Sequence, residues 1–494
     1  MTAYTQRWPT VIRRINSPLF VFLVVLIGLA ASFFYNKGGI LYYSESDHFL
    51  VNYLAPRPFL QKIFDVQKNE NTIAMYHGRE LGMYRGRELG FLFDWLDAHF
   101  IAFSLQCGLA HLYSLTFYAS LGLIALFFTL WARRCLALDY ITIGLLLALF
   151  MTAPPVFFTG FFFRSNKILT ALAIMLCVGL VAPRRRSAEQ SCMLPSFLEQ
   201  ARFSGMRRAL LFIASLMLAL ADEQGRFILL AACAYFAARS IIYRRRLEIT
   251  VTAILALALA GALVYNYLIG PWLIKDITNY KVSFKFQQLP WSDYSPLLLW
   301  QGFGLLNDTL RFFLGNLTPV QAAALLAFFA WLFFQAPAAR TGAMATEITT
   351  WKDRLAWGIP WLAFLAGITI MFSIMLIRFD MILQDDIRRI YYWTPTLVGL
   401  LLFTACAARL MLQQHGLNPT VLWIIMGLAL IANIRELPRH ERRIQAGYLT
   451  VEYATAPAVL ESLRRINDPN FIPPPFVVGS DYYHFMKTGQ RRIK

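Results

Sequence analysis

Long, mostly apolar runs separated by short basic segments constrain this chain more than any other feature of its sequence. The runs at 20–35 and 109–131 are clear examples. With 58% hydrophobic and only 15% charged residues, the chain has too little polar surface to cover an apolar core in water, since soluble domains carry about a quarter charged residues. In a bilayer the backbone must form a helix or a closed barrel. The runs are too continuous for the alternating segments of a barrel, so they predict membrane-spanning helices.

The formal net charge of +18 is concentrated in arginine clusters between the apolar runs. These clusters are 133–134, 184–186, 207–208 and 244–246. Basic residues in alternate loops mark the cytoplasmic side of a membrane protein. The clusters therefore orient the chain, with a cytoplasmic N-terminus, and we predict no nucleic-acid partner.

Counting the runs predicts an all-α polytopic membrane protein of about eleven transmembrane helices. The expected spans are 20–35, 109–131, 140–152, 168–182, 209–221, 227–243, 251–269, 320–335, 357–377, 390–408 and 421–433. Segment 297–314 is also apolar, but it carries Asp308 and Arg311. Because an ionised side chain at the bilayer centre costs roughly 2.5–3.5 kcal/mol, we expect this segment to lie in the interface. Twelve spans with a cytoplasmic tail are the alternative.

The expected organisation is one transmembrane domain, 1–433, and a short extracytoplasmic tail, 434–494. The first extracytoplasmic loop, 36–108, is long, is expected to contain amphipathic helices, and holds eight of the 28 acidic residues. Glu45 and Asp47 in this loop follow the first span directly. A carboxylate at the membrane surface can take a proton from a sugar hydroxyl. A solvated loop acid is the alternative interpretation of either residue.

The same loop contains the pentapeptide Gly-Arg-Glu-Leu-Gly twice, at 78–82 and at 86–90. The second copy opens a segment in which helical spacing collects apolar residues on one face, with Arg87 and Asp94 or Asp97 near the other. This pattern predicts a helix lying along the membrane surface. We expect the two aspartates to belong to a cover over the spans rather than to catalysis, and we count Arg87 among the candidates for substrate binding.

Three further polar groups fall on the face of the membrane that carries the long loop. They are Arg164 with Lys167, the hairpin tip Asp222 with Glu223, and Arg388 with Arg389. An arginine at headgroup depth can fork onto a phosphate, although snorkelling or topology anchoring explains any single one as well. Their convergence predicts a site for a phosphate-bearing lipid. The seven histidines are scattered, so no histidine–metal site is predicted.

This layout resembles the GT-C superfamily of integral-membrane glycosyltransferases, which use polyprenyl-phosphate-linked sugars. The resemblance follows the order of elements over most of the chain: the acids of the first loop, its amphipathic helices, the Asp222–Glu223 tip, and Arg388-Arg389-Ile390-Tyr391-Tyr392 before a late span. It implies that Asp47 or Glu45 is the catalytic base, and that Arg388, Arg389 and Tyr392 hold the donor phosphate. The usual Asp-Glu or Asp-x-Asp pair is Glu45-Ser46-Asp47 here, so the choice between the two acids stays open.

The resulting expectation is an enzyme of the bacterial cytoplasmic membrane with an extracytoplasmic active site. It would move a sugar from a polyprenyl-phosphate donor to a lipid, glycan or protein acceptor. No other cofactor is predicted, and a requirement for a divalent metal is left open. One alternative is a transporter or flippase of lipid-linked sugars, which would place polar groups at the bilayer midplane. Another is a polysaccharide polymerase or ligase, in which the long outer loop more often comes late in the chain.

Overall fold

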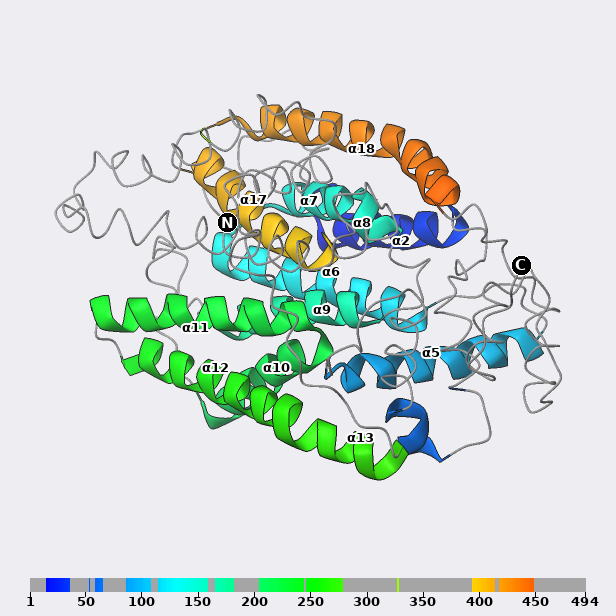
Figure 1. Ribbon diagram of the computed structural model, residues 1–494. Helices are drawn as coiled ribbons and strands as arrows, with labels where there is room; N and C mark the ends of the chain where they lie inside the picture. Colours follow the sequence, from blue (N-terminus) through cyan, green and yellow to red (C-terminus); the bar gives the residue numbers. More distant parts are fainter. Residues whose placement is uncertain are drawn as a thin grey trace, which may run out of the picture.

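The part of the chain that the structure describes consists of helices and short turns and contains no strand (Figure 1). The structure is a computed structural model, and it describes residues 15–35, 53, 58–64, 86–107, 114–158, 165–181, 204–243, 246–278, 327, 393–413 and 417–447. The helices are α2 (Pro18–Tyr35), α5 (Glu88–Gln106), α6 (Leu115–Leu136), α7 (Tyr140–Thr152), α8 (Pro154–Phe157), α9 (Asn166–Val181), α10 (Gly205–Ala221), α11 (Glu223–Tyr243), α12 (Arg246–Val264), the π-helix η4 (Tyr265–Ile269), α13 (Gly270–Thr278), α17 (Thr394–Gln413) and α18 (Pro419–Gly447).

Three helical stretches in this part are long and apolar enough to cross a membrane: Leu115–Leu136, Glu248–Ile277 and Pro419–Arg439. Shorter apolar helices accompany them, at Pro18–Phe34, Tyr140–Thr152, Asn166–Val181 and Thr394–Arg409. The chain is therefore a membrane protein built of helices. The expected spans 320–335 and 357–377 lie outside the described residues, as does the segment 297–314, so the number of spans stays a prediction.

The turn between α6 and α7 shows how local chemistry sets the helix ends. Ser114 begins α6 by accepting the N–H of Phe117 on its Oγ at 3.0 Å. At the other end Ala137 takes the left-handed conformation, with φ 50, which is a common helix stop. Asp139 then starts α7 by accepting the N–H of Thr142 at 2.8 Å. These caps satisfy backbone groups that a helix end leaves open.

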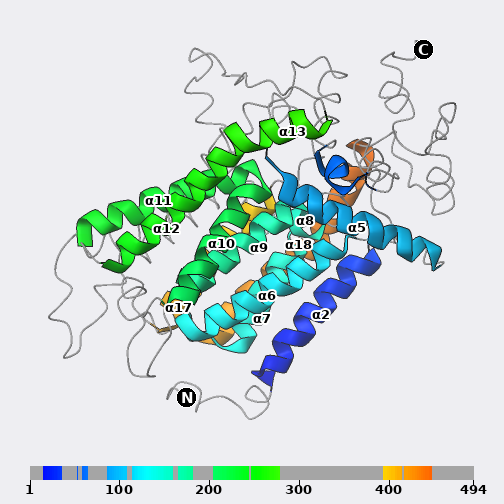
Figure 2. The same ribbon diagram turned by 90° about the horizontal axis from the view of Figure 1, so that it is seen from below.

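The core lies where α6, α7, α9, α10 and α17 pack together (Figures 1 and 2). Phe128, Phe150 and Phe403 are 0–1% exposed in it. By contrast, the outer face of α18 exposes Leu428 and Ile431 by 63% and 64%. Such apolar outer faces are stable where lipid surrounds the helices, since lipid is as apolar as the side chains.

Contacts between helix starts define one end of the bundle. Asn16 Oδ1 accepts the N–H of Tyr140 at 2.7 Å, and Trp423 Nε1 donates to Thr142 Oγ1 at 3.0 Å. The starts of α2, α7 and α18 are therefore together. We call this the arginine end, because the last turn of α6 and the first turn of α10 place four arginines here: Arg133, Arg134, Arg207 and Arg208.

The opposite end of the bundle gathers the remaining helix ends. Ser32 Oγ donates to the carbonyl of Phe157 at 3.3 Å, and Thr394 Oγ1 donates to the carbonyl of Pro155 at 3.1 Å. These bonds join the end of α2 and the start of α17 to α8. Asp222, between α10 and α11, lies at this end, which we call the Asp222 end. In Figure 2, α5 and α13 also lie there, and α5 runs at an angle to the spans.

Two helical stretches run further than the sequence predicted. The expected span 251–269 belongs to a continuous stretch made of α12, η4 and α13. The helix expected at 421–433 continues as α18 to Gly447, into the segment expected as a tail. Arg439 and Glu436 form an ion pair of 3.3 Å one turn apart there, which supports a polar helical extension.

Candidate functional site

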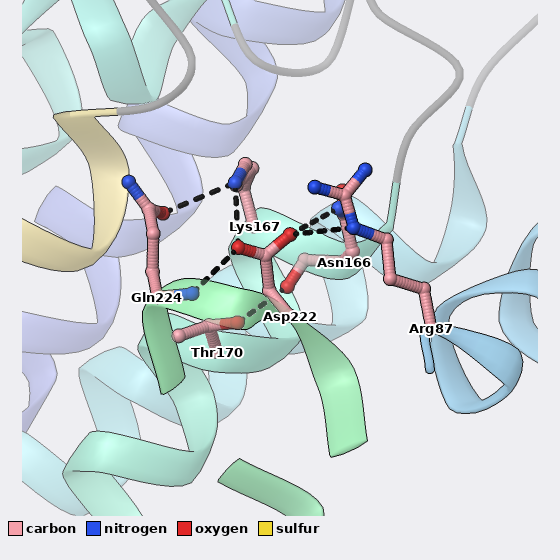
Figure 3. Close-up of polar contacts among 6 residues, drawn as sticks. All are labelled: Arg87, Asn166, Lys167, Thr170, Asp222 and Gln224. Carbon is pink, nitrogen blue, oxygen red and sulfur yellow. Dashed lines mark hydrogen bonds and ion pairs between the residues drawn. The ribbon is translucent and has the colours of Figure 1, made fainter. Parts of the chain in front are cut away.

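Five charged and amide side chains meet in the interior of the Asp222 end (Figure 3). Arg87 directly precedes α5, Asn166 and Lys167 begin α9, Asp222 links α10 to α11, and Gln224 lies in the first turn of α11. All five are 0–5% exposed. We call them the Asp222 cluster. Three separate regions of the sequence therefore supply one buried polar site.

The carboxylate of Asp222 is the centre of this cluster. Its Oδ1 lies 2.8 Å from Lys167 Nζ and accepts the N–H of Gln224 at 3.0 Å. Its Oδ2 accepts Asn166 Nδ2 at 2.6 Å and lies 3.5 Å from Arg87 Nε. Lys167 Nζ donates to Gln224 Oε1 as well, at 3.2 Å. Two cations thus share one carboxylate, and these three ionised groups sum to one positive charge.

These contacts decide the ionisation of Asp222. Burial by itself would raise its pKa, because it disfavours the charged form. The charges of Lys167 and Arg87, with the hydrogen bonds from Lys167 and from the N–H of Gln224, outweigh burial and hold the pKa below its ordinary value. Asp222 is therefore ionised at neutral pH. It can hold cations in place, but it is a poor acceptor of a proton.

Two more carboxylates tie α5 to neighbouring helix starts. Asp94 Oδ1 accepts the N–H of Ser165, next to α9, at 2.7 Å. Asp97 Oδ1 accepts the N–H of Thr116, in the first turn of α6, at 2.8 Å, and its Oδ2 accepts Ser114 Oγ at 2.6 Å. Burial raises the pKa of Asp97 to about 6, against the hydrogen bonds from these partners. The N-termini of α6 and α9 thus gain acceptors for N–H groups that have no partner within their own helices.

The sequence predicts that α5 lies along the membrane surface, and the charged face of such a helix would meet water. In the structure the charged side chains of α5 point inward instead. Asp94 and Asp97 are 5% and 1% exposed, whereas the apolar Leu96 and Phe103 are 46% and 60% exposed. The inward charges cap α6 and α9. The helix therefore packs on the ends of the spans, as a cover does, through the face that carries the two aspartates together with the buried Phe91 and Ala98.

Two glycines allow the backbone to approach closely around the cluster. Gly86 has a φ of 59, and a Cβ there would lie 1.6 Å from Asn266 Oδ1. Gly225 comes shortly after Asp222 in the sequence, and a Cβ added to it would lie 1.7 Å from the carbonyl oxygen of Leu218. The first glycine lets the backbone beside Arg87 lie against Asn266 of η4, and the second permits the tight α10–α11 turn that presents Asp222.

Of the residues predicted from the sequence to bind substrate, Arg87, Lys167 and Asp222 are in direct contact. Glu223 is the next residue, at the start of α11, and is partly exposed. The other predicted site residues lie outside the described residues: Glu45, Asp47, Arg164, Arg388, Arg389 and Tyr392. The last of them leads into Trp393 and Thr394, and Thr394 lies at the Asp222 end.

Sequence reasoning missed Asn166, Gln224 and Asn266. Asn166 and Gln224 are next in sequence to the predicted residues Lys167 and Glu223, and this adjacency was the one signal that could have identified them. Asn266 had a clearer one, because it is an amide within the expected apolar span 251–269. Within the described ranges, no group of three or more His, Cys, Asp or Glu residues is placed to hold a metal ion.

The helices, their apolar outer faces and the buried charged cluster at one end define an all-helical membrane protein. No protein-family model, curated protein or solved structure matches the chain.

Proposed function

We propose that this protein is a membrane glycosyltransferase of the GT-C type. It transfers a sugar from a polyprenyl-phosphate donor to a lipid, glycan or protein acceptor on the extracytoplasmic face. The observation that carries the proposal is the Asp222 cluster, in which Arg87 and Lys167 share one carboxylate. The surplus positive charge in a buried setting favours an anion nearby, and a phosphate diester is the anion of such a donor.

The depth of the cluster supports a lipid-linked donor. Lys167 is the second residue of α9, and Asp222 directly follows the last residue of α10. Both therefore lie where apolar helices end, at the level of lipid headgroups. The polyprenyl chain of a donor stays in the hydrocarbon, so its phosphate and sugar sit at this same level.

The charge distribution supports the side of the membrane. Arg133, Arg134, Arg207 and Arg208 lie at the arginine end. By the positive-inside rule that end is cytoplasmic, and the Asp222 end then faces outward together with the loop 36–108. A donor sugar delivered outside the cytoplasm would then be on the same side of the membrane as the cluster.

The placement of ionisable groups favours an enzyme over a transporter or flippase. The charged side chains of α6, α9 and α10 lie in the first or last turns of these helices, and α7 has no Asp, Glu, Lys or Arg within its bounds. A transporter places its polar sites near the bilayer midplane, between broken helices. These four helices keep their middles apolar, which suits a reaction at one membrane surface.

In this proposal Asp47 is the general base, with Glu45 as the alternative. The base takes the proton of the acceptor hydroxyl while that oxygen attacks the anomeric carbon and the polyprenyl phosphate leaves. Arg388, Arg389 and Tyr392 hold the phosphate, and Arg87 and Lys167 add positive charge beside it. A base of this kind contributes typically ~10²–10⁴-fold to the rate.

The test is transfer by the purified protein in lipid nanodiscs from a panel of radiolabelled polyprenyl-phosphate sugars. We expect one donor to lose its label to an acceptor extracted from the membrane. Asp47→Asn should abolish most transfer and leave donor binding intact, and Glu45→Gln should have the smaller effect. Swapped effects would exchange the two roles. Absence of transfer from every donor, or full transfer by both variants, would refute the proposed mechanism.

A further inference from the structure

The side chain of Asn266 is the least satisfied buried group near the Asp222 cluster. It is 3% exposed, and within the described part of the chain neither its Oδ1 nor its Nδ2 has a hydrogen-bond partner. Buried amides are almost always hydrogen-bonded, because losing water without a replacement is costly. An amide in this state indicates a function that the fold alone does not explain.

The backbone around Asn266 is unusual as well. Residues Tyr265–Ile269 form a π-helix, in which the N–H of Gly270 bonds to the carbonyl of Tyr265. Single π-helical turns inside α-helices are frequent at functional sites, because the extra residue re-aims side chains. Here the turn directs Asn266 inward, whereas the next residue, Tyr267, is 42% exposed.

The length of α12 places this turn at the membrane surface. Its 19 residues rise about 1.5 Å each, which gives about 29 Å, close to the ~30 Å of the hydrocarbon layer. Tyr265, Tyr267 and Trp272 follow, and such aromatic residues favour the membrane–water interface. Asn266 is therefore at the depth proposed for the donor's phosphate and sugar.

Asn266 also lies beside the cluster. Its Oδ1 is so close to Gly86 that position 86 has no room for a side chain. The next residue is Arg87, whose Nε lies 3.5 Å from Oδ2 of Asp222. The Asn166 amide donates its Nδ2 to Asp222, while its Oδ1 has no partner among the described residues. The side-chain amides of Asn166 and Asn266, both near Arg87, therefore keep polar atoms that could still form hydrogen bonds.

We infer that Asn266 binds the sugar of the lipid-linked donor through its hydroxyl groups. This inference rests on the proposed function. A carboxamide offers an acceptor and two donors on one plane, and a sugar hydroxyl both donates and accepts. A phosphate oxygen only accepts, so it would leave Oδ1 of Asn266 without a partner. The amide therefore suits the sugar, and the cations of the cluster suit the phosphate.

The test separates recognition of the sugar from a structural role. In Asn266→Leu, an unpartnered amide becomes an apolar side chain of similar size, so the melting temperature should stay unchanged or rise. We expect the Kd for the radiolabelled polyprenyl-phosphate sugar to increase about tenfold, the effect of losing one or two neutral hydrogen bonds. The Kd for sugar-free polyprenyl phosphate should not change. Asn266→Ala serves as the second variant should the leucine fit poorly.

Asn433→Leu is the matched control, because Asn433 is a buried asparagine on α18 that does have an interaction partner. It should lower the melting temperature and leave both Kd values unchanged. Equal Kd values for the glycosylated donor in wild type and Asn266→Leu would overturn the inference and leave the proposed function standing. Weaker binding of sugar-free polyprenyl phosphate would assign Asn266 to the phosphate instead. If the wild-type protein neither binds nor transfers any of the donors, both the inference about Asn266 and the proposed function are refuted.

Discussion

Asp222 receives a cation or a donor from every other member of its cluster, so its charge holds three segments of the chain together. Asp222→Asn keeps the shape but leaves Lys167 and Arg87 buried without a counter-charge. Breaking a buried ion pair on one side costs about 3–5 kcal/mol, and we expect a loss of this size in the free energy of unfolding. Denaturation of the purified protein in detergent measures it.

The control for that substitution is Asp276→Asn on the exposed surface of α13, at the same end of the bundle. Its effect should stay within about 0.5 kcal/mol, as for most surface changes. Equal stabilities of the two variants would show that the Asp222 charge does not hold the cluster together.

Asp97 gives the protein a dependence on pH. Burial raises its pKa from 3.8 to about 6, so between these values the folded state binds a proton that the unfolded state has lost. Stability contributed by this residue is therefore present below pH ~4 and is lost as the pH rises to ~6. Melting curves at several pH values should show this fall in the wild type and a smaller one in Asp97→Asn. Parallel curves for the two proteins would contradict the assignment.

At the scale of the element, α5 is held by the side that carries Asp94 and Asp97, where Phe91 and Ala98 are also buried, and not by the side of the exposed Leu96. Asp94→Ala removes the acceptor for the N–H of Ser165, so α5 should detach more readily from the start of α9. We expect amide hydrogen exchange in Glu88–Gln106 to become at least tenfold faster, while exchange in the middle of α10 stays slow. Leu96→Ala, on the exposed side of the same helix, is the control and should change neither rate. Faster exchange with the control alone would mean that α5 binds through the side of Leu96.

At the scale of the whole molecule, the two ends of the bundle make a prediction about the membrane. In a protein whose native cysteines are replaced, Arg208→Cys reports on the arginine end and Asp276→Cys on the Asp222 end, and both positions are exposed. An impermeant maleimide should label Asp276→Cys in intact cells, and Arg208→Cys only after permeabilisation. The reverse pattern would place the proposed site in the cytoplasm and refute the extracytoplasmic reaction.

The two ends also bear on the number of spans. The start of α2 lies at the arginine end, and α18 starts there and runs toward the Asp222 end. A chain that begins at one membrane face and finishes its last span at the other crosses an odd number of times. The prediction of eleven spans has this parity and the alternative of twelve does not, and labelling of cysteines placed in 434–494 tests which of the two holds.

The apolar runs by themselves determined that the chain is helical and lies in a membrane, because no other backbone arrangement suits such long apolar segments. The start of α7 was readable too, since Asp139 caps its own helix through a local bond. The pairing of charges was not readable. Lys167 and Asp222 are 55 positions apart, and their approach depends on how α9 and α10 pack. The sequence likewise places Asp94 and Asp97 on the charged side of α5. Only the tertiary structure turns that side inward, because the N–H groups that the two carboxylates satisfy belong to the segments that begin α6 and α9.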